Sequence, residues 1–294
     1  MIRGVFLFLA AVLAFPARPE NAAARFPVFA KPMLLGAHRG GRALWPENTV
    51  VAFRACAERW PDILLEGDLH LTADGHVVVL HDATVDRTTD GAGPVAGMTL
   101  EQVKQLDAGY RFTPDDGATF PWRGKGVTVP TLEEALQAAP EHRFIFEMKD
   151  GREIADATAA VLRRLDAEDR VILGSFTEAY VTRLRNLAPR VATCFHMPGA
   201  MRLVSAMRNG GWAEYEPTAP MLSVPDDLES RFGVSAEDVA RIRERGVCYQ
   251  VHTINDPEAM RAYIKKGADS ILTDNPELLA RVISETPPDT TASE

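Results

Sequence analysis

Cysteine is scarce in this chain of 294 residues, which contains only Cys56, Cys194 and Cys248. An odd number leaves at least one thiol unpaired, and the spacing matches no zinc motif. The sequence therefore argues against a disulfide-stabilised scaffold and against a cysteine-based metal centre. We expect the three thiols to act as small, buried apolar groups, with one disulfide as the alternative in an oxidising compartment.

Positive charge is also in short supply. Lys and Arg number 32 against 41 Asp and Glu, which gives a formal net charge of -9. An acidic protein lacks the basic surface that broad binding to nucleic acids or anionic membranes requires. We therefore expect no nucleic-acid partner, and any phosphate that the protein handles should meet a few local cations.

The apolar run Gly4–Phe15 is too short to span a bilayer, which takes about 20 residues. It follows the positive start Met1-Ile2-Arg3, and Ala22–Ala24 then offers small residues for cleavage. This pattern predicts a signal peptide over residues 1–24 and export to the periplasm or the medium, without stable membrane insertion afterwards. An uncleaved anchor is the alternative. At the other end, the polar residues 287–294 are expected to be a disordered tail.

From residue 25 to residue 286 the sequence alternates short apolar runs with amphipathic helical segments, which predicts one α/β domain. Setting aside one hairpin return, eight apolar runs are each followed by a helix, the order of a (β/α)8 TIM barrel. The eight strands are expected at 33–38, 63–69, 143–149, 171–175, 191–196, 220–224, 247–252 and 270–273. A doubly wound open sheet is the alternative, but no glycine-rich dinucleotide loop follows the first strand.

A β-hairpin is expected as an excursion after the second strand. Thr72–Gly75 contains an Asp-Gly pair flanked by alternating apolar residues, which is a strong hairpin signal. Folding the chain about a centre near residues 73 and 74 predicts Glu66 opposite His81. The turn-rich stretch 82–129 should then leave the barrel face as a long functional loop.

Polar residues lie at or near the ends of several expected strands, where an ordinary core would not tolerate them. They are His38, Arg39, Glu66, Asp68, His81, Glu147, Lys149, His196 and His252. Catalytic groups of such barrels gather at the C-terminal ends of the strands, so these residues are candidates for one active site. The alternative is a set of charges solvated at strand ends.

The carboxylates Glu66, Asp68 and Glu147 are expected on neighbouring strands. Residues 66 and 68 point the same way because strand side chains alternate with period two. Converging carboxylates repel one another unless a cation lies among them, and all-oxygen ligands suit Ca²⁺ or Mg²⁺ better than zinc. We therefore predict a divalent-cation site.

Two cations and two histidines complete the candidate site. Arg39 and Lys149 could neutralise charge that develops on a phosphoryl group, or else pair with nearby carboxylates. His38 and His81 could divide proton donation and proton acceptance between them, as phosphodiester cleavage requires.

Over residues 34–283 the sequence resembles the glycerophosphodiester phosphodiesterase family, in its exported bacterial form. The matching stretches are His38-Arg39-Gly40, Pro46–Thr49, Glu66-Gly67-Asp68, Thr72–Gly75, His81-Asp82, Arg87-Thr88-Thr89, Pro130–Glu134, Glu147-Met148-Lys149, Ser175-Phe176, Gly267–Asp269 and Thr273–Pro276. Each stretch alone is a weak signal, but their order and spacing together are specific.

The resemblance implies a metal-dependent barrel that hydrolyses small glycerophosphodiesters, such as glycerophosphocholine and glycerophosphoethanolamine, to sn-glycerol 3-phosphate and an alcohol. The implied roles are acid and base for His38 and His81, metal ligands for Glu66, Asp68 and Glu147, and phosphate binding for Arg39 and Lys149.

The sequence departs from the family pattern at His252-Thr253, where the family often has Trp-Thr. His252 and Phe176 are therefore candidates for the headgroup pocket, and the headgroup preference stays open. Two other functions remain as alternatives. One is a lysophospholipase D or phosphatidylinositol-specific phospholipase C on a similar barrel, and the other is a non-catalytic glycerophosphodiester-binding protein.

Overall fold

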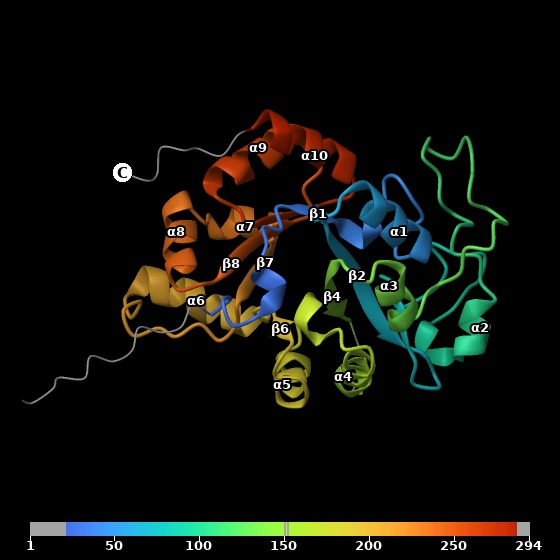
Figure 1. Ribbon diagram of the computed structural model, residues 1–294, viewed down its shortest axis with the longest axis horizontal. Coiled ribbons are helices and arrows are strands. Elements are labelled where there is room, and N and C mark those ends of the chain that lie inside the picture. The colour runs from blue at the N-terminus through green and yellow to red at the C-terminus, as the bar shows by residue number, and fades with distance from the viewer. Residues whose placement is uncertain (1–21, 150, 152, 287–294) are drawn as a thin grey trace, which may run out of the picture.

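Eight parallel strands form a nearly closed barrel in the computed structural model, which describes residues 22–149, 151 and 153–286 (Figure 1). The strands are β1 (Leu35–Ala37), β2 (Leu64–Leu71), β4 (Arg143–Met148), β5 (Val171–Gly174), β6 (Ala192–Thr193), β7 (Met221–Pro225), β8 (Cys248–His252) and β9 (Ser270–Thr273). They are hydrogen-bonded in the order β6-β5-β4-β2-β1-β9-β8-β7. The ends of this order meet where the Phe195 N–H donates to the Met221 carbonyl (2.8 Å). The predicted TIM barrel is confirmed.

Helices surround the strands (Figure 1). They are α1 (Val50–Arg59), α2 (Leu100–Lys104), α3 (Leu132–Ala138), α4 (Ile154–Arg164), α5 (Glu178–Leu187), α6 (Met197–Asn209), α7 (Asp226–Phe232), α8 (Ala236–Glu244), α9 (Pro257–Lys266) and α10 (Pro276–Glu285). Thr49 caps the start of α1, where its side chain accepts a hydrogen bond from the Ala52 N–H (3.2 Å). In the part of the chain that the structure describes, no helix has the length and apolar character needed to cross a membrane.

The predicted hairpin is present, but its register differs by one residue from the prediction. β2 pairs antiparallel with β3 (Val77–Val79), and Leu69 lies opposite Val79. The Thr72 N–H donates to the His76 carbonyl (3.0 Å), so the turn is centred on residue 74 and not between 73 and 74. Extended by this register, position 81 would lie opposite Gly67 and not opposite Glu66, so the predicted pairing of Glu66 with His81 is wrong.

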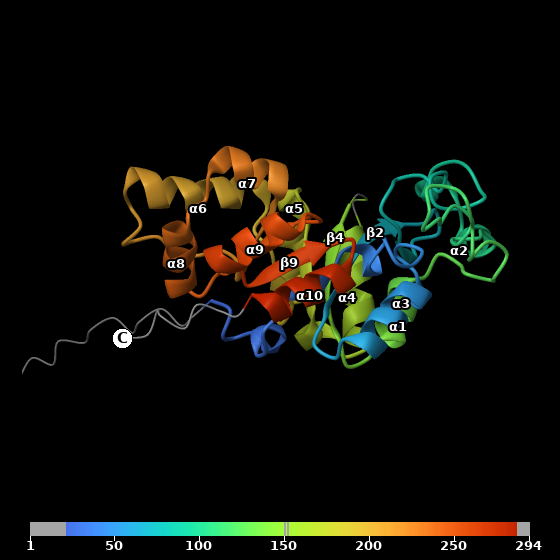
Figure 2. The same ribbon diagram turned by 90° about the horizontal axis from the view of Figure 1, so that it is seen from above.

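The stretch 82–129 leaves the barrel as predicted. Both views place it to one side of the barrel, beyond α1 and α3 (Figures 1 and 2). It contains α2 and a 3-10 turn at Val95–Gly97, and is otherwise made of loops and turns. Buried valines, among them Val85, Val103 and Val127, give it a small core of its own.

Most of the predicted signal peptide, residues 1–21, lies outside the described residues, as does the predicted tail at 287–294. Ala23 is described, and its N–H donates to the Gly246 carbonyl (2.9 Å). All three cysteines are also described, and each is free. Cys56 and Cys194 are buried as expected, whereas Cys248 is only partly buried.

Gly67 shows why two acidic residues of β2 are separated by a glycine. A Cβ atom at this position would lie 2.9 Å from Asn48 Oδ1, 3.0 Å from Val79 Cγ1 and 3.1 Å from Phe146 Cε1. We expect Gly67→Ala to lower the free energy of unfolding by about 1–3 kcal/mol because of overpacking, measured by urea denaturation. Gly97→Ala is the control, because its Cβ would meet nothing closer than Pro94 Cγ at 3.5 Å. Equal stability of Gly67→Ala and the original protein would contradict this account.

Candidate active site

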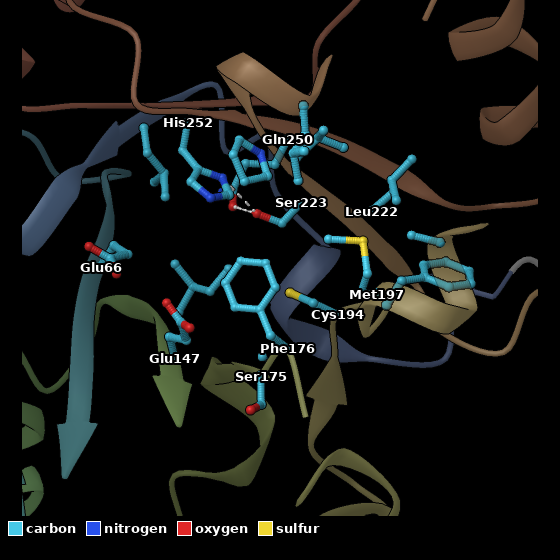
Figure 3. Close-up of a pocket in the computed structure, with 18 of the residues that line it drawn as sticks. Glu66, Glu147, Ser175, Phe176, Cys194, Met197, Leu222, Ser223, Gln250 and His252 are labelled. Carbon is cyan, nitrogen blue, oxygen red and sulfur yellow. Dashed lines mark hydrogen bonds between the residues drawn. The ribbon is translucent and has the colours of Figure 1, made fainter. Parts of the chain in front are cut away.

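One cavity of about 360 Å³ brings together the site residues proposed from the sequence apart from His196, which does not line it. Its lining includes His38, Arg39, Glu66, Asp68, His81, Glu147, Lys149, Phe176 and His252. Figure 3 shows Glu66 and Glu147 on one side of this cavity, with His252 and Phe176 facing the same space. The barrel therefore gathers the predicted residues as expected for the C-terminal ends of its strands.

Parallel pairing explains how the acidic residues come together. Asp68 of β2 lies directly beside Glu147 of β4 in the register of these two strands. Glu66 lies two positions before Asp68, so it projects to the same face. Lys149 follows β4, and its N–H donates to the Leu69 carbonyl (3.1 Å), which extends the pairing beyond the strand.

Each candidate catalytic histidine is held through Nδ1 by an aspartate. His38 Nδ1 lies 2.6 Å from Asp274 Oδ1, and His81 Nδ1 lies 2.7 Å from Asp82 Oδ1. Burial alone would raise the pKa of Asp274, but its hydrogen bond with His38 and the charges of His38 and Arg42 outweigh burial and lower that pKa to about 2. A carboxylate only accepts, so Nδ1 of each ring carries a hydrogen and Nε2 is left for proton transfer.

Burial affects the protonation of His81. It lowers the pKa of His81, and it outweighs the nearby Asp68 and Asp82 carboxylates, which act in the opposite direction. His81 is therefore mainly neutral at pH 7, the form that can accept a proton. Its carbonyl is hydrogen-bonded to Nε2 of the buried His70 (3.1 Å), a residue outside the set of site candidates predicted from the sequence.

Lys149 joins two of the candidate metal ligands. Its Nζ lies 3.0 Å from Asp68 Oδ1 and 2.6 Å from Glu147 Oε2. Burial alone would raise the pKa of Asp68, but Lys149, and then His81 and a hydrogen bond from Asn48, outweigh it and lower that pKa. Asp68 is thus ionised and is the central anion of the site.

At Glu66 the nearby positive charges do not offset the effect of burial on the carboxylate. Burial and the neighbouring Asp68 raise the pKa of Glu66 well above its ordinary value, although the Arg39 N–H donates to its Oε2 (2.7 Å). A raised pKa of this kind fits a site that lacks positive charge.

The structure does not itself assemble the predicted metal triad. Among the residues that it describes, no three His, Cys, Asp or Glu side chains are grouped closely enough to hold a metal ion. Lys149 instead forms ion pairs with Asp68 and Glu147. The donor set of Glu66, Asp68 and Glu147 nevertheless fits Ca²⁺ or Mg²⁺ in its chemistry, so these residues remain the predicted ligands.

Arg39 offers an unused donor to the cavity. Its backbone is left-handed (φ 52°), and its Nη1 donates to Glu47 Oε1 (3.0 Å). Its Nε is buried without a hydrogen-bond partner and lies 3.8 Å from Asp68 Oδ2. A buried guanidinium N–H without a partner suits an anionic oxygen such as that of a phosphate. The sequence prediction assigned no role to Glu47, although this residue lies in the matched stretch Pro46–Thr49.

His252 is fixed by a chain of hydrogen bonds along the barrel wall. Ser223 Oγ donates to Gln250 Oε1 (2.7 Å) and also lies 3.1 Å from His252 Nδ1 (Figure 3). Because the serine hydroxyl has one hydrogen, His252 Nδ1–H is the donor in the second bond. Burial, and then the charges of His38 and Lys149, lower the pKa of His252 to about 4, so the ring is neutral at pH 7. Its Nε2 is then an acceptor.

The model of the glycerophosphoryl diester phosphodiesterase family matches residues 38–278, most of the chain. The chain belongs to this family. Membership confirms the resemblance seen in the sequence, and it makes the chain an enzyme of phosphodiester hydrolysis rather than a binding protein alone.

Relatives within the glycerophosphoryl diester phosphodiesterase family cover nearly the whole chain. A glycerophosphodiester phosphodiesterase from Caldanaerobacter subterraneus is 32% identical over 256 residues, covering 85% of this chain and 97% of that protein. One from Bacillus subtilis is 26% identical and covers 96% of this chain and 97% of that protein.

Solved structures of this family share the barrel. The glycerophosphodiester phosphodiesterase of Agrobacterium tumefaciens matches with a TM-score of 0.67 at 26% identity, covering 85% of this chain and 99% of that one. An Oleispira antarctica phosphodiesterase was solved in complex with the product sn-glycerol-3-phosphate. It matches with a TM-score of 0.69 at 24% identity, covering 87% of this chain and 99% of that one. The second likeness is evidence for the fold.

Proposed function

We propose that the enzyme hydrolyses glycerophosphodiesters, including glycerophosphocholine and glycerophosphoethanolamine, to sn-glycerol 3-phosphate and a free alcohol. The observation that carries this proposal is the pair of aspartate-held histidines, His38 and His81, that line one cavity with Arg39 and Lys149. The product bound to the Oleispira antarctica neighbour is the product expected here.

In the proposed reaction the two imidazoles divide the proton transfers. An oxygen nucleophile loses a proton to one ring as it bonds to phosphorus, and water completes the hydrolysis. The P–O bond to the headgroup breaks, and the other ring protonates the departing alkoxide. Asp274 and Asp82 keep each ring oriented and stabilise the imidazolium that forms on it.

Charge on the phosphoryl oxygens needs compensation in the transition state. Arg39 Nε and the Lys149 ammonium are the cations available for this in the proposed site. We propose that Glu66, Asp68 and Glu147 also hold a Ca²⁺ or Mg²⁺ ion, which would neutralise negative charge next to the phosphate.

The experiment that tests the proposed function is product analysis on glycerophosphocholine. The expected products are sn-glycerol 3-phosphate and choline in equal amounts, identified by phosphorus and proton NMR. Glycerol and phosphocholine would show cleavage of the other ester bond, and a lasting cyclic phosphate would favour the phospholipase C alternative. Either result, or no turnover, would contradict the proposal.

His252 is proposed to contribute to the choice of headgroup. We expect His252→Trp to change the ratio of kcat/KM for glycerophosphocholine over glycerophosphoethanolamine by about tenfold, because it exchanges a neutral hydrogen-bond acceptor for a large apolar wall. His252→Gln, which retains an acceptor, is the control. An unchanged ratio in His252→Trp would remove His252 from the specificity determinants.

Export remains part of the proposal, with the mature enzyme in the periplasm or the medium. The supporting observation is the sequence of residues 1–24, with its positive start and short apolar run. N-terminal sequencing of the protein from exported fractions is expected to show that the apolar run is missing. An intact Met1 on exported protein would contradict cleavage.

A further inference from the structure

Glu47 lies at the centre of a network of charged side chains behind the cavity. Its Oε2 accepts a hydrogen bond from Arg87 Nη1 (2.8 Å), and its Oε1 accepts from Arg87 Nη2 (2.8 Å) and from Arg39 Nη1 (3.0 Å). A third guanidinium, that of Arg42, forms an ion pair with Oε2 at 3.9 Å. The side chain of Glu47 is only 11% exposed, so this carboxylate is largely removed from water while it meets three cations.

One arm of the network runs from Glu47 to His81. Arg87 donates from Nε to Asp82 Oδ2 (2.7 Å) and from Nη2 to Asp82 Oδ1 (3.1 Å). Asp82 Oδ1 is also the oxygen that lies 2.7 Å from His81 Nδ1. Because the guanidinium is a rigid planar fork, its position fixes both carboxylates at once.

The other arm runs from Glu47 to His38. Arg42 Nε lies 3.0 Å from Asp274 Oδ1, and the same oxygen lies 2.6 Å from His38 Nδ1. Asp274 follows β9, whereas Arg42 and Glu47 lie between β1 and α1. A chain of alternating carboxylates and guanidiniums from distant parts of the sequence therefore connects His38 to His81.

Glu47 is ionised in this network. Burial alone would raise the pKa of Glu47, but the hydrogen bond from Arg87 and the charges of Arg39 and Arg87 outweigh it and lower that pKa. A largely buried carboxylate persists in its charged form only when it is paired, and the guanidiniums are its partners here. Neither Glu47 nor Arg87 lines the cavity, so each can influence the reaction only through the residues that do.

We propose that Glu47 is a positioning residue, which fixes the orientation of both histidines and of Arg39 from behind the cavity. This inference rests on the proposed function, because it assumes that the two rings transfer the protons. Rotation of either aspartate would turn its imidazole away from the reacting oxygens, and a misplacement of about 1 Å can lower a rate about 10²-fold. One carboxylate that is linked to both rings keeps the proton donor and the proton acceptor at a fixed separation.

Glu47→Gln tests this role. It retains the size of the side chain, but one oxygen becomes an amide group that donates and cannot accept a guanidinium hydrogen. On glycerophosphocholine we expect kcat to fall about 10- to 100-fold and KM to rise, because Arg39 loses its anchor as well. Arg87→Gln removes only the arm to His81, so kcat should fall while KM stays unchanged.

The ring nitrogens give a readout that a purely structural role would not move. At about pH 8, above the ordinary pKa of imidazole, nitrogen NMR of labelled enzyme reports which ring nitrogen carries the hydrogen. In the unmodified enzyme we expect it on Nδ1 in both rings. Arg87→Gln should move hydrogen toward Nε2 in His81 alone, and Glu47→Gln should do so in both His38 and His81.

A matched pair of control residues lies at the opposite end of the barrel. Glu168 precedes β5, and its side chain is 10% exposed. Arg190 Nη1 lies 3.5 Å from Glu168 Oε2, and Arg190 also pairs with Asp169, so it bridges a glutamate and an aspartate as Arg87 does. Glu168→Gln and Arg190→Gln should leave kcat, KM and the ring signals unchanged.

Unchanged kcat and ring signals in a folded Glu47→Gln protein would overturn the inference, and so would a lower kcat without any change in the ring signals. If circular dichroism shows that Glu47→Gln does not fold, Arg87→Gln decides in its place through His81, because the Arg87 side chain is 43% exposed and is less critical for packing. No turnover of glycerophosphocholine by the unmodified enzyme would overturn the proposed function, and the ring signals would still decide whether Glu47 orients the histidines.

Discussion

Replacing His38 or His81 by alanine is expected to lower kcat on glycerophosphocholine by about 10²–10⁴-fold, since each removes a group proposed to transfer a proton in the reaction. The two effects should not add, because the rings serve one reaction coordinate and the loss of either one disables the proton transfer. Initial rates of the two single variants and of the double variant measure this.

Asp274→Asn separates the loss of a ring from the loss of its orientation. It retains the size of the side chain but replaces the carboxylate oxygen that holds His38 Nδ1 at 2.6 Å. We expect kcat to fall while the fold persists, as judged by circular dichroism. His76→Ala is the control, because His76 is an exposed hairpin residue outside the cavity lining. Full activity in either His38→Ala or His81→Ala would refute the proposed acid–base pair.

Removal of divalent cations is expected to reduce activity by about 10³-fold or more, because a bound cation supplies several kcal/mol of charge stabilisation in the transition state. The measurement uses enzyme treated with chelator and then supplied with Ca²⁺, Mg²⁺ or Zn²⁺ separately. The all-oxygen donor set predicts recovery with one or both of the first two.

A binding measurement makes this prediction independent of turnover. An ion that binds the folded protein raises the melting temperature with ion concentration, and this rise should be absent in Glu66→Gln. Glu134→Gln is a suitable control, because that carboxylate pairs with Lys104 away from the cavity lining. Activity that is insensitive to the chelator, together with no thermal shift, would remove the metal from the mechanism.

Strand order and side-chain alternation were enough to predict most of the candidate site. The period of two placed Glu66 and Asp68 on one face, and the barrel placed Glu147 on the adjacent strand. The structure confirms this neighbourhood, because Asp68 and Glu147 are direct partners across β2 and β4. These rules depend only on residues within a strand or on adjacent strands.

The partner of His38 is harder to predict, because Asp274 lies 236 positions away in the sequence. The two residues meet because β1 pairs with β9, where Ala37 lies opposite Thr273. No local pattern encodes this closure. The prediction of the hairpin register was wrong for a different reason. The register depends on the length of the turn, and an error of one residue there shifts every pair.

Histidines at strand ends also look alike in a sequence. His196 and His252 each follow an apolar strand, but His196 Nδ1 accepts a hydrogen bond from the Gly199 N–H (3.3 Å) and caps α6. His252 faces the cavity, and its tautomer depends on Ser223. Only the tertiary environment distinguishes a capping residue from a cavity residue.

The position of the barrel seam has an evolutionary consequence. The hydrogen-bonded order of the strands begins at β6 and ends at β7. Only an isolated bridge between Cys194 and Met221 joins these two end strands in the described part of the chain. Uncharged cavity residues such as Met197, Leu222 and Leu228 come from α6, β7 and α7 beside this seam. Most of the proposed site residues lie on or next to the continuous ladder of β1, β2 and β4. Substitutions in α6 and α7 can therefore accumulate without shifting the proton-transfer groups. New substrates can be explored on one half of the barrel while the chemistry is inherited on the other.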